Sequence, residues 1–229
     1  MAELSLRADP AADAAAEREA SAFLFHWLAT IFAAAPTVEQ VEAFRTGAGA
    51  PLLAALTDDP DLAPAVRAMR QALLRAGAAK AAAVEIETSF NLLFLGLSGP
   101  ETVPPYESAH TSEDGRLFQQ ATVRMDALLS SLGMSASGLP AEPSDHVSIE
   151  LETLAELIRR GDEAGRSRFV EDHLLVWIPS FCRMAIARDR QGFYGAAARL
   201  LGVLVERESV QRQPAIALAT KTEDASCRH

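Results

Sequence analysis

Apolar residues recur every three or four positions along most of the chain, which is the spacing that places side chains on one face of an α-helix. No segment alternates β-branched and polar residues over the length of a strand. The pattern therefore predicts an all-α fold. The clearest helical faces are formed by Ile86, Phe90, Leu93 and Leu97, by Leu117, Ala121, Met125, Leu128 and Leu132, by Val147, Leu151, Leu154 and Ile158, by Val170, Leu174, Trp177, Phe181 and Met184, and by Phe193, Ala197, Leu200 and Leu204.

Prolines and glycines divide this pattern into roughly eight to ten helices. We expect residues 1–213 to form a single helical bundle, with residues 1–15 loose at its start. Residues 214–229 lose the apolar pattern, and we expect them to form a polar, flexible tail. Pro179 stands inside a helical run and should kink that helix near Leu175, since proline removes one backbone hydrogen bond and clashes with the preceding turn. Breaks between helices are expected at Pro36, residues 47–51, Pro60, and residues 98–105, 133–143 and 161–165.

The chain has 229 residues, of which 49% are hydrophobic, so it can bury a sizeable core. Residues 1–20 are acidic and rich in alanine, and they lack the positive segment that opens a secretory signal. The most apolar stretch, residues 23–35, contains His26 and is shorter than the roughly 20 residues of a membrane span. These features predict a soluble, cytoplasmic protein that does not insert into membranes.

The formal net charge is −10, from 31 acidic against 21 basic residues. This excess argues against a nucleic-acid-binding surface and favours a cationic partner through long-range attraction, although the same charge would serve solubility alone. Two cysteines, Cys182 in an apolar run and Cys227 near the end, form neither a disulfide framework nor a metal-ligand spacing.

Two places in the sequence could belong to an enzyme, and neither has the residues or the setting that catalysis requires. Residues 47–49, Gly-Ala-Gly, lack the lysine and the preceding strand of a phosphate-binding loop. Cys182 lies among Phe181, Met184 and Ile186, where burial would raise the pKa of the thiol and leave it unreactive. We therefore expect no enzymatic activity and no cofactor.

A metal site in a helical bundle requires paired Glu-x-x-His motifs on facing helices. One such motif is present, from Glu107 to His110, and His146, Glu150 and His173 are further candidate ligands. The plainer interpretation is a histidine at a helix start, a solvated glutamate and a histidine on a buried face. A helical metal-dependent enzyme is therefore the less favoured alternative, and we expect no bound metal.

Two loops are unusual. Residues 99–108, Gly-Pro-Glu-Thr-Val-Pro-Pro-Tyr-Glu-Ser, place prolines around an aromatic residue and cannot be helical before Pro105. Residues 142–146, Glu-Pro-Ser-Asp-His, immediately precede the amphipathic helix predicted for residues 147–158. A helix start explains the proline and Asp145, whose carboxylate would stabilise the positive end of the helix dipole. It does not require a histidine after the aspartate.

These loops resemble the hallmarks of the TorD/DmsD family of redox-enzyme maturation chaperones, namely a Pro-Pro-aromatic-Glu-Ser loop and a Glu-Pro-x-Asp-His motif followed by a glutamate-bearing helix. Both occur in the family's order. Residues 115–118 and the helix ending at residues 133–134 are also similar to the family's connection between them. The resemblance covers residues 90–156. Residues 109–110, Ala-His, depart from the hydrophobic-aromatic pair that is usual at this point.

The resemblance implies an all-helical, TorD-like single domain that binds the twin-arginine signal peptide and the apo-form precursor of a molybdopterin-dependent oxidoreductase. Such a chaperone delays export until cofactor insertion and folding are complete. The alternatives are a NarJ-like chaperone of a membrane-anchored nitrate reductase and a purely structural helical adaptor. Cofactor-synthesis proteins are further candidate partners. We expect a monomer, although residues 133–143 are long enough to let two copies exchange helices as a domain-swapped dimer.

A twin-arginine signal carries two guanidinium groups followed by an apolar segment, so its receptor needs carboxylates beside a hydrophobic groove. We expect Asp145 to contact the arginines, with Glu142 and Glu107 nearby. Because His146 follows Asp145 directly, we expect it to orient that carboxylate or to sense protonation.

The apolar part of the site is carried over from the resemblance. It implies that signal-peptide contacts come from Phe90, Leu93 and Phe94 before the first loop, and from Pro105 and Tyr106 within it. The first three residues fit an ordinary core equally well.

Overall fold

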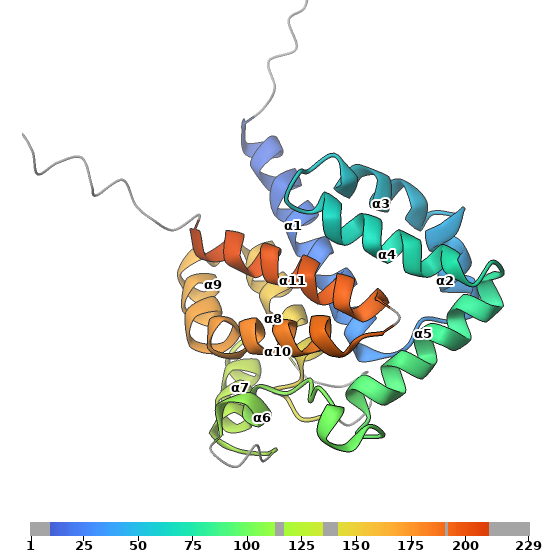
Figure 1. The fold of residues 1–229 in the computed structure, drawn as a ribbon. Helices are drawn as coiled ribbons and strands as arrows, with labels where there is room; N and C mark the ends of the chain where they lie inside the picture. Colours follow the sequence, from blue (N-terminus) through green and yellow to red (C-terminus); the bar gives the residue numbers. More distant parts are fainter. Residues whose placement is uncertain (1–9, 113–116, 135–141, 191, 211–229) are drawn as a thin grey trace, which may run out of the picture.

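The computed structural model describes residues 10–112, 117–134, 142–190 and 192–210 as a set of packed helices (Figure 1). These residues contain no β-strand, so the predicted all-α fold is confirmed. In chain order the helices are α1 (Pro10–Ala33), α2 (Val38–Arg45), α3 (Gly49–Thr57), α4 (Ala63–Arg75), α5 (Ala79–Phe94), the 3₁₀ turn η1 (Gly99–Glu101), α6 (Glu107–Thr111), α7 (Gln120–Ser131), α8 (Val147–Arg160), α9 (Glu163–Phe169), the π-helical turn η2 (Val170–Leu174), α10 (Leu175–Arg188) and α11 (Phe193–Val210).

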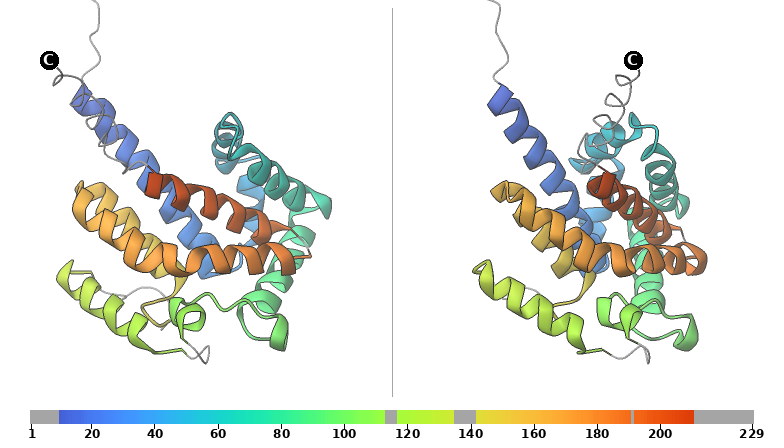
Figure 2. Two further views of the ribbon diagram at one scale, coloured as in Figure 1. Left: turned by 60° about the vertical axis from the view of Figure 1, so that its left-hand side comes forward. Right: turned by 90° about the vertical axis from the view of Figure 1, so that its left-hand side faces the viewer.

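Packing between distant parts of the sequence builds one core. The first helix, α1, packs along α8, and α11 packs on both α10 and α4, while α2 packs against α5. Figure 2 shows α6 and α7 together at one end of the molecule, below α10. Each of these helices turns an apolar face inward, and several of these faces carry aromatic rings. The largest fully buried side chains include Phe25, Phe32, Trp177, Phe181 and Tyr194.

Local sequence explains several helix boundaries. Thr37 and Gln40 form a capping box at the start of α2, each side chain accepting a hydrogen bond from the other residue's backbone N–H. Gly161 adopts a left-handed φ of 66° and ends α8. The carboxylate of Asp162 then accepts a 2.8 Å hydrogen bond from the N–H of Gly165 and caps α9. The break predicted after α8 is therefore shorter than expected, because Gly165 already lies within α9.

The first helix begins at Pro10, so residues 10–15 are helical where a loose segment was predicted. Proline is favourable in the first turn of a helix, and the alanines that follow have the highest helix propensity of all residues. The predicted tail, residues 214–229, lies outside the described residues.

The helical run from residue 163 to residue 188 changes type along its length. Pro179 lies inside α10 and has no N–H to donate to the carbonyl of Leu175. The π-helical turn η2 ends at Leu174, directly before the position at which a kink was predicted. Such turns occur frequently at functional sites, and this one places His173 in the interior, with a side chain 8% exposed.

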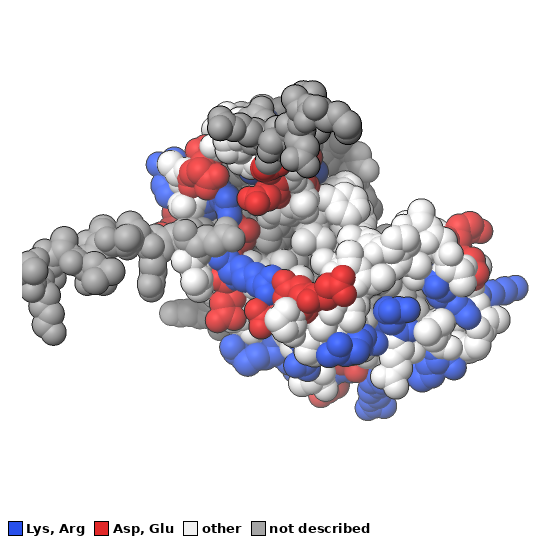
Figure 3. Space-filling model, turned by 90° about the horizontal axis from the view of Figure 1, so that it is seen from above, with Lys and Arg blue, Asp and Glu red and all other residues white. Residues whose placement is uncertain are grey.

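Acidic and basic side chains are interspersed on the face shown in Figure 3, with a broad uncharged surface between them. Some of these charges are paired across the fold. Arg207 of α11 contacts Asp59 at 2.6 Å and Asp61 at 2.7 Å, both in the segment before α4. The guanidinium of Arg207 lowers the pKa of Asp59 to about 2. Within the described ranges, no helix is both long enough and apolar enough to cross a bilayer.

Candidate functional site

The two unusual loops lie side by side. Tyr106 and His146 form an isolated antiparallel β-bridge. The first loop leads directly into α6 and the second into α8, so both helices begin at this bridge. The structure therefore brings together candidate residues from the two motifs. Backbone hydrogen bonds flank the bridge, from the N–H of Glu107 to the carbonyl of Asp145 at 2.9 Å and from the N–H of Val147 to the carbonyl of Pro105 at 2.8 Å.

Asp145 connects these loops to the adjoining helices. Its side chain is fully buried, and each carboxylate oxygen accepts a hydrogen bond. The N–H of Ser108 donates at 2.9 Å, and the hydroxyl of Thr122 in α7 donates at 2.8 Å. The predicted contact of Asp145 with the arginines stays a prediction, and in this structure the loop turns the carboxylate toward the protein's own donors.

Tyr106 and Glu142 form the outer part of the same assembly. The Tyr106 hydroxyl donates a 2.6 Å hydrogen bond to Glu142, and its ring stands edge-on to His146 with centroids 5.1 Å apart. Burial, reinforced by the Glu142 carboxylate, raises the pKa of Tyr106. Glu142 is partly exposed, whereas Glu107 and Asp145 are completely buried. Of the three predicted carboxylates, Glu142 is therefore the one that a ligand can reach.

His146 caps α8 and does not orient Asp145 through a hydrogen bond. Its Nδ1 accepts from the N–H of Ser148 at 3.2 Å and lies 2.7 Å from the hydroxyl of the same residue. Burial lowers the pKa of His146 from 6.5 to about 4, although Glu142 and Asp145 act in the opposite direction. A neutral imidazole at neutral pH is what this cap requires, because protonation of Nδ1 would remove the acceptor.

This cap predicts a pH dependence of stability. As the pH falls from 6.5 toward 4, His146 takes up a proton in the unfolded chain but not in the folded chain. The free energy of unfolding therefore decreases over this range from its value above pH 6.5. The loss that His146 causes is at most about 3 kcal/mol. In His146→Asn the amide oxygen can still accept from Ser148 without titrating. Urea unfolding between about pH 7 and pH 4 should therefore show a shallower decline for the variant. Parallel declines would contradict this assignment.

Behind the bridge, Glu107 reaches into a buried cluster. One carboxylate oxygen accepts a 2.6 Å hydrogen bond from Arg124 of α7, and the other lies 2.8 Å from Nδ1 of His173 in η2. The His173 ring stacks on Phe169, with centroids 5.1 Å apart. The helix α7 and the π-turn η2 therefore both contact the one carboxylate that α6 contributes.

Glu150, in the first turn of α8, is the second carboxylate of this cluster and is also fully buried. Its Oε2 accepts a 2.9 Å hydrogen bond from Nε1 of Trp177. Its Oε1 meets no N–H or O–H donor among the described residues. Burial, and after it the neighbouring Glu107 carboxylate, raise the pKa of Glu150 well above its usual range.

The structure sorts the five metal-ligand candidates of the sequence. Glu107, Glu150 and His173 converge, each offering a ligand atom within 4.8 Å of the others. His110 and His146 bond other groups of the protein instead. The Glu-x-x-His spacing therefore suggested the wrong histidine for Glu107, since its partner His173 lies 66 residues away.

Phe90, Leu93 and Phe94 are buried on the inner face of α5. Phe94 lies at the centre of an aromatic cluster, 5.1 Å from the ring of Tyr194 and 6.1 Å from that of Phe181. These three residues form core in this arrangement, which is the plainer of the two expectations. Leu93 also reaches a surface pocket beside the end of the helix.

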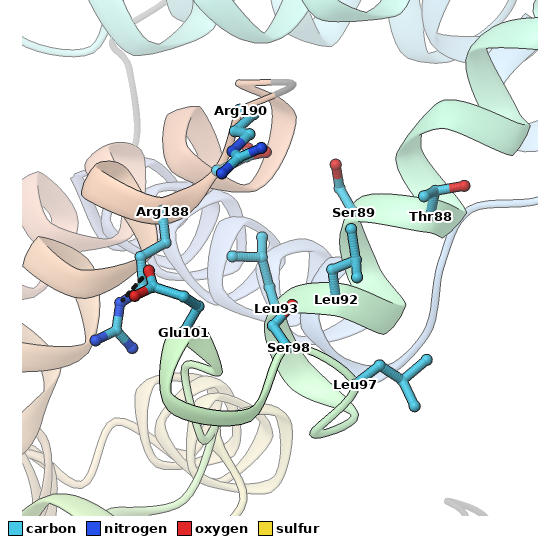
Figure 4. A pocket seen from close by; sticks show the side chains of 10 residues that line it. Thr88, Ser89, Leu92, Leu93, Leu97, Ser98, Glu101, Arg188 and Arg190 are labelled. Atoms are coloured by element: carbon cyan, nitrogen blue, oxygen red, sulfur yellow. Dashed lines mark ion pairs between the residues drawn. The ribbon is translucent and has the colours of Figure 1, made fainter.

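This pocket has a volume of about 550 Å³ and lies between the end of α5, η1 and the end of α10 (Figure 4). Leu92 and Leu97 form its apolar side and are 45% and 68% exposed. Arg188 and Arg190 line the opposite side, and Glu101 lies beside Arg188, with 3.7 Å between its carboxylate and Nε of the arginine. The pocket thus combines accessible apolar side chains with charged groups of both signs.

Sequence reasoning missed Leu92 and Leu97 as candidate binding residues. The sequence did contain an indication of them. Residues 92–97, Leu-Leu-Phe-Leu-Gly-Leu, place apolar side chains on both sides of a helix. Because one face of such a helix is buried, the apolar side chains on its other face must be exposed. Arg124 and Trp177 were also missed as members of a site. Nothing in the local sequence connects these two residues to the carboxylates that they bond.

Comparison with known proteins gives the family. The family model described as nitrate reductase delta subunit matches residues 58–183. Chaperone protein TorD of Vibrio vulnificus (strain YJ016) is 32% identical over 194 residues, covering 80% of this chain and 90% of that protein. The chain belongs to the TorD/DmsD family. Chaperone protein TorD of Aeromonas salmonicida (strain A449) is likewise 32% identical over 207 residues, covering 85% of this chain and 92% of that protein.

Membership of the TorD/DmsD family, whose members are redox-enzyme maturation chaperones, agrees with the resemblance found in the two loops. The matched range contains both loops, the α5 side of the pocket and the whole buried cluster. Both relatives are named chaperone protein TorD, and each aligns with this chain over most of its own length. Apart from the Arg188 and Arg190 side of the pocket, the described site therefore lies within the range that the family model matches.

Proposed function

We propose that this TorD/DmsD family member is a cytoplasmic chaperone that binds the twin-arginine signal peptide and precursor of a molybdopterin-dependent oxidoreductase. It delays export of that precursor until the cofactor has been inserted. The observation that carries the proposal is the exposed apolar pocket beside the first hallmark loop. The TorD name of the relatives favours an exported client over the NarJ-like alternative, and a chaperone over an enzyme.

The apolar segment of the signal peptide would contact Leu92 and Leu97. Burial of apolar surface supplies about 25 cal/mol for each square ångström, so these side chains would contribute much of the affinity. The loop that starts at the pocket rim leads to Tyr106, five residues after Glu101, and an extended chain of that length spans at most about 18 Å. One extended peptide can therefore contact both the pocket and the joined loops.

The arginine pair would bind at Glu142. This carboxylate is accessible and already holds the Tyr106 hydroxyl, so its position is defined before a peptide arrives. An exposed arginine–carboxylate pair contributes about 1 kcal/mol or less. The arginines would therefore provide selectivity, and the apolar pocket would provide affinity.

Calorimetric titration tests this assignment. A twin-arginine signal peptide should bind more tightly than its twin-lysine counterpart, because a guanidinium can form two parallel hydrogen bonds with one carboxylate. Glu142→Gln should reduce that preference by a factor of about 5, which corresponds to roughly 1 kcal/mol. Glu163→Gln, which alters an exposed carboxylate on α9, is the matched control.

The possible results separate the two parts of the proposal. Failure of every signal peptide to bind would contradict the chaperone function. Tight binding with the same arginine preference in Glu142→Gln would retain the function and move the arginine contact elsewhere.

A further inference from the structure

We propose that Glu107, Glu150 and His173 together bind one divalent transition-metal ion, with Zn²⁺ the ion whose ligand preferences they match. The three side chains come from α6, α8 and η2, and their ligand atoms lie within 4.8 Å of one another. An imidazole nitrogen combined with carboxylate oxygens is a donor set that Zn²⁺ accepts. This site is separate from the surfaces assigned to the signal peptide.

The distances suit a shared ion. Nδ1 of His173 and Oε2 of Glu107 are 2.8 Å apart. With metal–ligand bonds of about 2.0 to 2.1 Å, that separation corresponds to an angle of about 85 to 90° at the metal. A tetrahedral Zn²⁺ site would place these two atoms about 3.3 Å apart, so they would have to separate by about 0.5 Å, and Glu150 would complete a set of three protein ligands.

The unpaired oxygen of Glu150 is an independent indication. A buried carboxylate oxygen without a donor is costly, and native proteins rarely leave one so. Oε1 of Glu150 has no N–H or O–H donor among the described residues, and besides Trp177 the Glu150 side chain contacts the Glu107 carboxylate, which could pair with it only through a shared proton. A metal ion in the cluster would give this oxygen a partner.

Each carboxylate has its remaining oxygen held by the protein. Arg124 bonds Oε1 of Glu107, and Trp177 bonds Oε2 of Glu150. Metal-binding carboxylates are commonly oriented in this way by hydrogen bonds from a surrounding layer of residues. The arrangement leaves one oxygen of each carboxylate for the cluster.

The local charge also favours a divalent ion. Glu107, Asp145 and Glu150 are three buried carboxylates in neighbouring positions. In the described part of the chain, Arg124 is the one Lys or Arg side chain seen to bond any of them. A proton shared by Glu107 and Glu150 would leave one negative charge, which only a second proton, on His173, could balance. A divalent ion beside a neutral His173 would balance the three carboxylates together with Arg124.

Arg124 connects the cluster to a surface pocket. This side chain is 48% exposed, and it lines a surface pocket of about 330 Å³ together with Thr111 and Gln119. Rotation of Arg124 would open the cluster to that pocket. A bound ion would then tie α6 and α8, which start at the two hallmark loops, to the π-turn. Its role would be to hold the loops in register.

Metal binding to the purified full-length chain tests the proposal. After treatment with a chelator, the protein should bind one Co²⁺ per chain with the absorption bands of a protein-ligated ion, and Zn²⁺ should displace it. Zn²⁺ should also raise the melting temperature, because it binds the folded state. Glu150→Gln and His173→Gln should each lower the affinity at least about tenfold.

A surface pair supplies the matched controls. His26 and Glu152 form a 2.6 Å contact on the outside of α1 and α8, with side chains 45% and 30% exposed. His26→Gln and Glu152→Gln should leave metal binding unchanged. These changes alter the same residue types, and Glu152 lies two positions after Glu150 on the same helix.

Three results would overturn the proposal. One is the absence of Co²⁺ and Zn²⁺ binding by the folded wild-type chain. The other is binding that persists in both Glu150→Gln and His173→Gln, as an ion held by Cys227 and His229 would behave. An infrared band of a protonated carboxylic acid that survives metal addition and disappears in Glu150→Gln would show a shared proton in place of the ion.

Discussion

Replacing Asp145 with alanine is expected to lower the free energy of unfolding by about 3 to 5 kcal/mol. The change removes two hydrogen bonds to a charged acceptor, each worth about 1.5 to 3 kcal/mol, and leaves the N–H of Ser108 and the hydroxyl of Thr122 buried. Urea unfolding monitored by circular dichroism measures this loss directly. The effect should be large because a single carboxylate joins the start of α6, the start of α7 and the second hallmark loop.

Asp126→Ala is the matched control for this experiment. Asp126 lies on α7, as Thr122 does, but is exposed, so its replacement should change the free energy of unfolding by less than about 0.5 kcal/mol. Equal stability of the two variants would show that the buried carboxylate does not hold the loops. Loss of signal-peptide binding in Asp145→Ala would by itself reflect this structural damage, and so Glu142→Gln is the cleaner test of arginine recognition.

Replacing both Leu92 and Leu97 with serine is expected to weaken binding of a signal peptide by a factor of about 30 to 150. Full burial of a leucine contributes about 1.5 to 3 kcal/mol, and the two side chains are already partly covered, so a combined loss of about 2 to 3 kcal/mol is expected. Calorimetry with a twin-arginine peptide measures the change. Protein stability should hardly alter, because both side chains are exposed.

Leu74→Ser is the control for this surface. Leu74 lies on α4, is 50% exposed and is not among the residues that line the pocket. Its substitution should leave the affinity unchanged. An equal loss of affinity in this variant and in the double variant would indicate a general effect of surface hydrophobicity and would remove the pocket from the proposal.

The helical architecture followed from the sequence because each long helix repeats one physical requirement, an apolar face turned inward. In α8 the predicted residues Val147, Leu151, Leu154 and Ile158 are all buried. The same rule failed at Leu97, which continues the apolar spacing of α5 but lies beyond the end of that helix and is 68% exposed. The apolar spacing identifies which face of a helix is buried, but it does not show where the helix stops. Gly96, with a φ of 78°, ends the helical path before Leu97.

The site was predicted only in part. The two motifs were found because their prolines and charged residues are unusual in local sequence, and the structure joins them through Tyr106 and His146. The burial of Asp145 could not be predicted, since it depends on Thr122, a residue with no distinctive local pattern. The pairing of Glu107 with His173 likewise depends on how α6 packs against the π-turn. Tertiary packing decided both.

The separation of these partners along the chain has a consequence for folding. Asp145 bonds a residue 37 positions earlier, and Glu107 bonds one 66 positions later. Contacts between distant residues form slowly, because the entropy of closing a long loop must be lost before they are gained. During synthesis, the contact between Glu107 and His173 therefore cannot form until the chain beyond residue 173 has emerged and packed. Competence to capture a client would arise at the end of the chaperone's own folding, so that an unfinished chain does not occupy a precursor.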